Sequence, residues 1–439
     1  MSWYIEEQEP VYLDYNATTP LDSTVKKAIA EGLELWANPS SKTPLALKAK
    51  EAIEKAKRSL GELLHVSDAE VVFTSGGTEA NNWVIYSAIE SFKSASQRCS
   101  DVPHVISSTI EHPSILEPLR HLRDNGSIEL SLLPVDPTSG QVVPSDLEKF
   151  VSPSTCLLTV MLANNETGVL QPIPELSVAA RRASKKHGNS IFVHSDASQA
   201  VGKLDVNIAE LKVDAITVAG HKFYGPRNGA LVVRSQYATQ ILPMLRGGGQ
   251  ERGLRSGTEN TPVIMGLGAA AATFSPKVEA HLRDIRDYFE QRLHELVPEE
   301  HVVHFQHSPR LPNTSSVAFP KYPKPSPDLV AKCKTFYAST GAACHSVSHL
   351  VIVTVETECA STSSAASSYA FLSSWFSAVL LACGIPKEVA ERTVRFSFGR
   401  ETTKDDVDRV VKELKAILFL AKHGSSLMNV INKGPVPGF

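Results

Sequence analysis

Hydrophobic positions follow two different periods that alternate along the first part of the chain. Between residues 45 and 64, apolar side chains recur every three or four positions with lysines and glutamates between them, which predicts an amphipathic helix. From Glu70 onward, short apolar runs alternate with helical patterns. Strands are expected at residues 70–74, 104–107, 128–135, 156–162, 191–194, 215–218 and 229–233, and helices at 79–92, 113–124, 144–151 and 175–187. Repeated strand–helix units predict right-handed crossovers and a mostly parallel sheet of the seven-stranded type.

A different pattern follows Thr258. Helices are expected at 262–274, 278–296, 327–338 and 405–423, and short strands at 302–305, 317–319 and 394–398, with a further strand and helix near the N-terminus at 11–15 and 25–35. Short strands with helices on one side are typical of a small α+β unit. At 439 residues, the chain is also too long for one compact core. We therefore expect an α/β large domain over residues 21–275 and a smaller domain built from residues 1–20 and 276–439.

The segment from 347 to 377 fits neither period. It begins with an apolar run and continues as a Ser/Ala-rich stretch that is nearly uncharged. Such composition is typical of a loop or an insertion. Our hypothesis is a lineage-specific insertion or an unspliced intron, because the pattern is lost directly after Ser346 and returns at Val379. A contiguous read through these codons in abundant spliced message would exclude the intron.

Composition and charge exclude several classes of partner. The chain is 42% hydrophobic and 21% charged with a formal net charge of -3, so no nucleic acid or membrane partner is expected from electrostatics. No apolar run has the length of a bilayer span, and neither a signal nor a transit peptide is visible at the acidic N-terminus. We therefore expect a cytoplasmic protein. The cysteines show no CxxC spacing, which favours free thiols over disulfides or a zinc site: 99, 156, 333, 344, 359 and 383.

Lys222 lies between two expected strands, at 215–218 and 229–233. A lysine is costly to bury unless it is neutral, paired or covalently used. A desolvated lysine with a lowered pKa is the amine that forms Schiff bases. The spacing alone favours a simpler interpretation, in which Lys222 is a loop lysine with a salt-bridge partner.

Other polar groups also follow expected strands, and each has a structural alternative. The turn before Thr78 opens a helix, so its amides could hold a phosphate, or Thr78 could act as a cap. Asp196 could cap a helix or pair with a protonated ring nitrogen. His112 could stack on a flat cofactor or only begin a helix. Asn165 and Gln199 could contact a ring oxygen or satisfy loop backbone. Together, these groups are of the kinds that bind pyridoxal phosphate. They follow expected strands, and α/β sheets bind ligands at the carboxyl ends of their strands.

Several longer motifs occur in a characteristic order: residues 12–20, 38–41, 74–82 (TSGGTEANN), 111–112, 164–168, 196–199, 220–226 (GHKFYGP), 255–258 and 395–400 (RFSFGR). With these motifs the chain resembles the fold-type-I pyridoxal-phosphate enzymes of the class V aminotransferase group, in the cysteine desulfurase and selenocysteine lyase branch. The resemblance extends from about Val11 to about Val410, apart from 347–377.

The resemblance implies a role for each candidate. Lys222 would be the Schiff-base lysine, Asp196 would pair with the pyridine nitrogen, and His112 would stack on the ring. The ring oxygen would be contacted by Asn165 and Gln199, and the phosphate by Gly77, Thr78 and His221. The family often has a serine where this chain has Ala219. The phosphate would also be contacted by Thr258 from a second subunit, which implies a homodimer. The substrate carboxylate would be bound by Asn38 and by Arg395, whose guanidinium can form two parallel hydrogen bonds to a carboxylate.

Cys344 could be an ordinary small hydrophobe, which is the usual role of a free cysteine. In the resembled family a catalytic cysteine lies in a short loop at this point. The Cys-His-Ser sequence from Cys344 to Ser346 is closer to the selenocysteine lyases than to the desulfurases. The expected activity is therefore the decomposition of L-selenocysteine to L-alanine and selenide, with a selenium or sulfur acceptor protein as a further partner. Two alternatives remain: a cysteine desulfurase that supplies iron–sulfur assembly, and a cofactor-binding pseudoenzyme with a disrupted cysteine loop.

Overall fold

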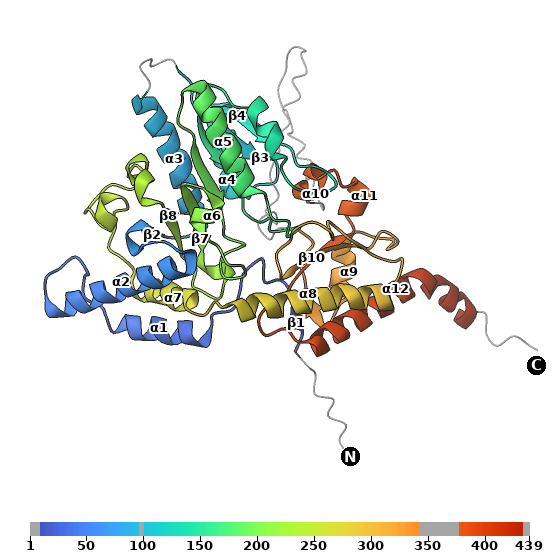
Figure 1. Ribbon diagram of the computed structural model, residues 1–439. Helices are drawn as coiled ribbons and strands as arrows, with labels where there is room; N and C mark the ends of the chain where they lie inside the picture. Colours follow the sequence, from blue (N-terminus) through green and yellow to red (C-terminus); the bar gives the residue numbers. More distant parts are fainter. Residues whose placement is uncertain (1–8, 96–100, 342–376, 433–439) are drawn as a thin grey trace, which may run out of the picture.

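The computed structural model describes residues 9–95, 101–341 and 377–432. Figure 1 shows a larger α/β unit and a smaller unit, with the long helices α8 (Pro276–Leu296) and α12 (Lys404–Asn432) side by side along the smaller one. Among the described residues, no helix combines the length and the apolar character that crossing a membrane requires.

The larger unit is built on a seven-stranded sheet. Its strand order is β2 (Val71–Thr74), β8 (Gly229–Val233), β7 (Ala215–Ala219), β6 (Phe192–Asp196), β5 (Thr155–Thr159), β3 (His104–Ser108) and β4 (Glu129–Leu133). Every neighbouring pair is parallel except those that include β8, which runs antiparallel to both β2 and β7. The predicted fold class, a mostly parallel α/β sheet, is confirmed.

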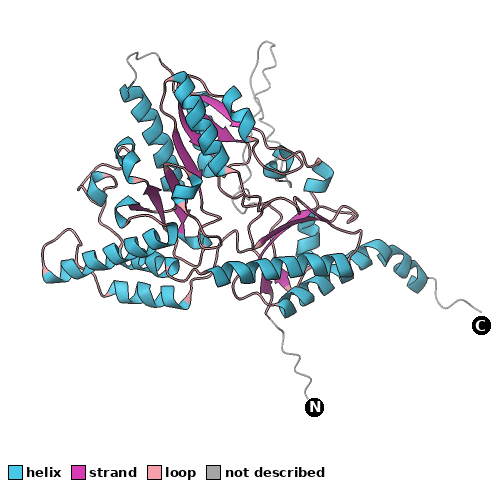
Figure 2. Ribbon diagram, viewed as in Figure 1, coloured by secondary structure: helices cyan, strands magenta, loops and turns pink. Residues whose placement is uncertain are grey.

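Helices cover both faces of this sheet (Figure 2). Alternate residues of each strand enter different cores because side chains alternate across a strand. On one face, Val72 and Leu157 pack with Trp83 of α3 (Gly77–Ala95), and α4 (Pro113–Asp124) lies beside α3. On the other face, Phe73 and Leu158 belong to the core that includes residues of α2 (Pro44–Leu64), α5 (Ile173–His187) and α7 (Thr261–Ala271).

Small residues allow α7 to pack closely, as its Ala/Gly-rich sequence suggests. A Cβ added at Gly268 would lie 2.6 Å from Ala56 Cα of α2. A Cβ added at Gly32 of α1 (Ser23–Leu33) would lie 2.5 Å from Pro262 Cα. Distances this short exclude any side chain at either position. Asp22 caps α1 by accepting a hydrogen bond from Thr24 N at 2.7 Å.

The smaller unit contains a three-stranded antiparallel sheet of β12 (Thr393–Ser397), β10 (Thr314–Ala318) and β9 (Val302–Val303). A second, parallel pair joins β1 (Val11–Tyr12) to β11 (Phe336–Tyr337). The core of this unit includes a group of aromatic rings, in which Phe289 lies 4.8 Å from Phe396 and 5.2 Å from Phe398 between centroids. The remaining short helices are α6 (Ile208–Leu211), α9 (Ser326–Lys332), α10 (Ala378–Ala382) and α11 (Lys387–Ala390).

The expected helix at 327–338 was wrong in its second half. Helix α9 ends at Lys332, and Phe336 enters β11, where it is buried beside the N-terminal strand. A partner more than three hundred residues away cannot be read from local periodicity. Residues 144–149 form a 3₁₀ helix within the expected helix at 144–151.

The domain boundary at residue 275 stays a prediction. Val11 and Leu13 belong to the core of the smaller unit, together with residues of α8 and α12. Leu311 and Val379 lie beyond residue 275 but pack in the core of the larger unit. The chain therefore crosses between the two cores more often than a single boundary suggests.

Candidate active site at the strand ends

Five strands, β2, β3, β5, β6 and β7, run in the same direction, so their carboxyl ends meet at one edge of the sheet. Each ends at or shortly before a residue selected from the sequence: Gly77, His112, Asn165, Asp196 and Lys222, respectively. The fold therefore gathers candidates that are separated by up to about a third of the chain.

Lys222 ends a 3₁₀ turn that directly follows β7. Its Nζ donates hydrogen bonds to the backbone oxygens of Asn16 (2.8 Å) and Ala17 (2.9 Å). Gly220 allows this tight turn, since an added Cβ would lie 2.7 Å from Pro226 O. The amine is thus directed at the N-terminal segment that follows β1, across the edge of the sheet.

Asp196 and His112 are connected by a short hydrogen-bond network. Asn81 Nδ2 donates to Asp196 Oδ2 and to Ser114 Oγ, each at 2.8 Å. Asp196 also accepts from Ser198 N at 2.9 Å. The network orients a carboxylate that is only 7% exposed. A carboxylate held in this way can stabilise a proton on a ring nitrogen.

His112 is the N-cap of α4, as the structural alternative predicted. Ser114 N donates to His112 Nδ1 at 3.1 Å, so this nitrogen carries a lone pair and the proton of a neutral ring lies on Nε2. The capping contact fixes the ring edge but does not cover the ring face. Capping and stacking on a flat ligand are therefore compatible.

The turn before α3 has the features of an anion cradle. Helix α3 begins at Gly77, and the first amides of a helix have no partner within it. A Cβ added at Gly76 would meet nothing within 4 Å, whereas one at Gly77 would lie 3.3 Å from Ser198 Oγ. Gly76 therefore borders open space, and Gly77 brings the helix start close to the end of β6. Thr78 follows in this first turn and is exposed.

Positive charge also lies around His221, which belongs to the 3₁₀ turn after β7. Burial, followed by the charges of Lys222 and Arg227, lowers the pKa of His221 to about 4. His221 Nδ1 also lies 3.2 Å from Thr18 Oγ1. A neutral histidine among cationic groups fits a bound dianion, which would offset the local charge. Together with the Gly76–Gly77 start of α3, this charge distribution fits the phosphate of pyridoxal phosphate.

Sulfate should report on this electrostatic arrangement, because it stays doubly charged at mildly acidic pH. A bound anion raises the pKa of a nearby histidine by roughly 1–3 units. By linkage, protonation of His221 then strengthens sulfate binding as the pH falls. We expect calorimetric titration of the cofactor-free protein to show an affinity gain of at least about twofold between about pH 7 and pH 5. An unchanged pH dependence in H221N would contradict this assignment.

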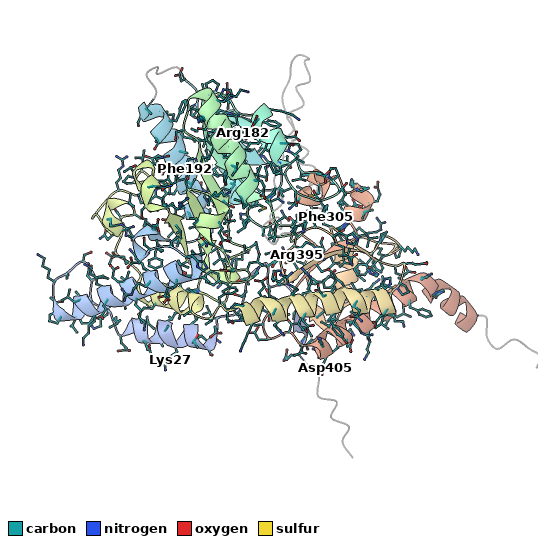
Figure 3. All side chains as sticks on the ribbon, in the orientation of Figure 1. Lys27, Arg182, Phe192, Phe305, Arg395 and Asp405 are labelled. Carbon is teal, nitrogen blue, oxygen red and sulfur yellow. The ribbon has the colours of Figure 1, made fainter. Side chains whose placement is uncertain are left out.

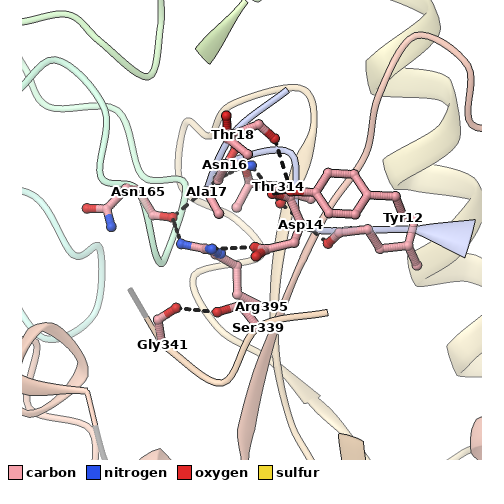
Figure 4. Close-up of polar contacts among 12 residues, drawn as sticks. Tyr12, Asp14, Asn16, Ala17, Thr18, Asn165, Thr314, Ser339, Gly341 and Arg395 are labelled. Carbon is pink, nitrogen blue, oxygen red and sulfur yellow. Dashed lines mark hydrogen bonds and ion pairs between the residues drawn. The ribbon is translucent and has the colours of Figure 1, made fainter. Parts of the chain in front are cut away.

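Arg395 lies on β12, between the two units (Figure 3). Its Nη1 donates to Asn165 O at 2.9 Å, and its Nη2 pairs with Asp14 Oδ1 at 2.5 Å (Figure 4). The residue is 3% exposed, and its Nε has no hydrogen-bond partner among the described residues. An unsatisfied donor on a buried guanidinium is costly. It is therefore a reasonable point for a ligand carboxylate to bind. In Figure 4 the carboxamide of Asn165 points away from Arg395.

Two expected site residues, Asn38 and Thr258, are not brought into this cluster, and a third lies outside the described residues. Asn38 is exposed, and its Oδ1 accepts a hydrogen bond from Ser40 N at 3.0 Å, so its pairing with a substrate carboxylate stays a prediction. Thr258 is exposed and lines a cavity of about 310 Å³ with Ser75 and Arg227. Its predicted role in a second subunit is not tested by a single chain. Cys344 lies outside the described residues, as does the segment at 347–376.

Gln199 lies in the cluster, but both ends of its side chain are already engaged. Its Nε2 donates to Asn16 O at 3.0 Å, and its Oε1 accepts from Lys203 Nζ at 2.8 Å. Sequence reasoning missed both partners. Asn16 occurs in the motif at 12–20, which could have identified it, whereas Lys203 resembles any loop lysine in the sequence.

Glu111 was also missed as an individual group, although it lies in the motif with His112. Burial raises its pKa to about 8, partly offset by hydrogen bonds from Ser108 and Met161 N, and the charge of Asp196 raises it further. The side chain is therefore mostly protonated at neutral pH. A protonated Glu111 leaves Asp196 without a second negative charge beside it.

The fold and this edge define an enzyme of the pyridoxal-phosphate-dependent α/β class, and comparison with known proteins agrees. Residues 11–410 match the family described as aminotransferase class-V. The chain belongs to this family, whose members depend on pyridoxal phosphate.

Among its relatives, the selenocysteine lyase of Bos taurus is 42% identical over 433 residues, which cover 93% of each chain. The cysteine desulfurase IscS of Methanosarcina thermophila is 34% identical and covers 96% of this chain and 95% of its own. A solved structure of a NifS-like protein superposes with a TM-score of 0.78 at 30% identity, covering 94% of this chain and 100% of that one. The resemblance inferred from the motifs is confirmed.

Proposed function

We propose that this protein is a pyridoxal-phosphate-dependent lyase that converts L-selenocysteine to L-alanine and selenium. The observation that carries the proposal is the convergence of Lys222, Asp196 and His112 at one sheet edge, in a chain 42% identical to a selenocysteine lyase. Removing one selenium atom from the substrate leaves L-alanine with no net gain of hydrogen. A two-electron reduction by thiols then turns this selenium into selenide.

The residues present fit the cofactor. Gly77, Thr78 and His221 would hold its phosphate, where cationic neighbours favour a dianion. His112 would lie against its ring, and Asp196 would pair with its nitrogen. Asn165 and Gln199 would contact its oxygen side, and Lys222 would attach it. When bound, the cofactor supplies the electron sink that makes loss of the α-proton feasible.

The position of each protein group supports a particular role in the reaction. Lys222 Nζ would remove the α-proton as general base, after exchanging its contacts to Asn16 O and Ala17 O for the substrate. Asp196 would hold a proton on the ring nitrogen, which Asn81 and Ser198 orient it to do. Arg395, helped by Asn38, would bind the substrate carboxylate through the unsatisfied Nε.

Further parts of the proposal concern partners and location. Thr258 would complete the phosphate site of a second subunit in a homodimer. Cys344 would assist removal of selenium as nucleophile or acid and pass it to a thiol or an acceptor protein. The balanced composition and the scattered cysteines, which show no CxxC spacing, support a cytoplasmic location.

Alanine release from selenocysteine and from cysteine, measured side by side on purified holoprotein, tests the function. We expect turnover of selenocysteine with little turnover of cysteine, since a selenol is the better leaving group. Comparable turnover of cysteine would instead assign the protein to the desulfurases, to which it is less similar. A protein that binds the cofactor and releases alanine from neither substrate would be a pseudoenzyme.

A further inference from the structure

Lys203 is a buried lysine in the turn that follows β6, only 4% exposed. Its Nζ donates to Asn16 Oδ1 at 2.9 Å and to Gln199 Oε1 at 2.8 Å. Both acceptors are uncharged amide oxygens. Lys203 forms no ion pair with a carboxylate within the part of the chain that the structure describes. Such an environment is unusual, because a buried ammonium needs a counter-charge.

The surroundings favour the neutral amine. Burial, followed by the charges of Lys222 and Arg395, lowers the pKa of Lys203 well below its usual value. A neutral amine has two N–H groups. The two amide oxygens match these two donors, so each N–H group of the neutral amine has an acceptor. Lys203 therefore acts as a fixed hydrogen-bond donor to both amide oxygens.

This donor and the backbone oxygen of Asn16 together decide how the amide of Gln199 is oriented. The oxygen and nitrogen of a glutamine amide have similar shapes, so their partners determine which end faces which way. With Oε1 held by Lys203, Nε2 faces Asn16 O at 3.0 Å, the same oxygen that accepts from Lys222 Nζ at 2.8 Å. One N–H of Nε2 is used in this contact, and the second is left to donate to another acceptor.

Asn16 is oriented by more than one partner. Asn313 Nδ2 donates to Asn16 Oδ1 at 3.2 Å, and Asn16 Nδ2 donates to Thr314 Oγ1 at 2.8 Å. Loss of Lys203 would therefore leave Asn16 largely in place. Among the described residues, Gln199 Oε1 accepts a hydrogen bond only from Lys203, so the effect of Lys203 should pass mainly through Gln199.

We propose that Lys203 is a positioning residue, which holds Gln199 so that its Nε2 presents a donor to the ring oxygen of the bound cofactor. This inference rests on the proposed cofactor dependence. Lys203 would not touch the cofactor or the substrate. It would act by preventing Gln199 from turning its own oxygen toward an oxygen of the cofactor, where two acceptors would repel each other.

A double-mutant cycle tests the proposal. Cofactor-free protein is titrated with pyridoxal phosphate, and the dissociation constant is measured by fluorescence for wild type, K203M, Q199M and the double variant. We expect each single substitution to weaken binding by up to about tenfold, the value of one hydrogen bond. The double variant should have about the same affinity for pyridoxal phosphate as the single variant with the lower affinity, because the two residues act as a unit.

Each other outcome has a separate meaning. If the losses multiply, Lys203 acts independently of Gln199 and the proposal is wrong. If K203M lowers only the free energy of unfolding and leaves cofactor affinity unchanged, its role is merely structural and the proposal is again wrong. If the wild type itself binds no cofactor, the proposed function has failed. Should K203M not fold, the same cycle is run with K203L, which also removes the amine donor.

Discussion

Replacing Lys222 with alanine is expected to reduce alanine release from selenocysteine by at least about 10²–10⁴-fold, the usual contribution of a general base. The loss should be larger still if Lys222 also holds the cofactor, since both roles use the same Nζ. The absorbance band of the lysine-bound cofactor should be absent from K222A. Absorbance spectra and single-turnover kinetics measure the two effects separately.

The fold should survive this substitution. Lys222 makes its contacts to Asn16 O and Ala17 O at the edge of the sheet and not in its core. The matched control is K27A, which removes an exposed lysine of α1 that lies 3.9 Å from Glu31. K27A should keep wild-type spectra and rates. A K222A protein that retained the absorbance band would refute the assignment of Lys222.

Replacing Arg395 with alanine is expected to affect both stability and substrate binding. Removing one partner of a buried ion pair costs about 3–5 kcal/mol. Because the Asp14 side chain is 19% exposed, we expect a loss near the lower end, about 3 kcal/mol in urea unfolding. The KM for selenocysteine should rise by roughly 10–100-fold, since a hydrogen bond to a charged group contributes about 1.5–3 kcal/mol.

A second variant separates the two roles of Arg395. D14N removes the carboxylate of the ion pair but keeps the guanidinium that would bind substrate. We expect D14N to lose much of the same stability with a smaller change in KM. An equal increase of KM in D14N and R395A would mean that Arg395 acts only as a structural partner of Asp14.

Local signals were sufficient to predict most elements of the larger unit. The helix at Pro113–Asp124 and the strand at Gly229–Val233 have the predicted bounds. Both are marked by strong cues: a proline at the first helical position, and a short apolar run after a glycine. Because parallel strands share one carboxyl edge, the order of strands and helices also placed Lys222, Asp196 and His112 near one another.

The signals failed where a distant segment decides the structure. Residues 336–337 continue a helical pattern in the sequence, but pairing with β1 draws them into a strand. The network from Asp196 through Asn81 to Ser114 joins three separate elements, and no spacing in the sequence indicates it. Side-chain hydrogen bonds between distant elements depend on angstrom-scale packing, which periodicity does not encode.

By itself, the sequence determined the class of fold and the identity of the reactive groups. Both depend on local chemistry. Alternating hydrophobic periods define strands and helices, and the residue types themselves determine that a lysine can react as an amine, that a carboxylate can pair with a cation and that a glycine-rich turn can bind an anion. Only the tertiary structure decided the environment of these groups. Lys203 and Glu111 are ordinary charged residues in the sequence, yet burial favours the neutral form of each. The cost of removing water from a charge depends on everything packed around it, and that is set when the whole chain has folded.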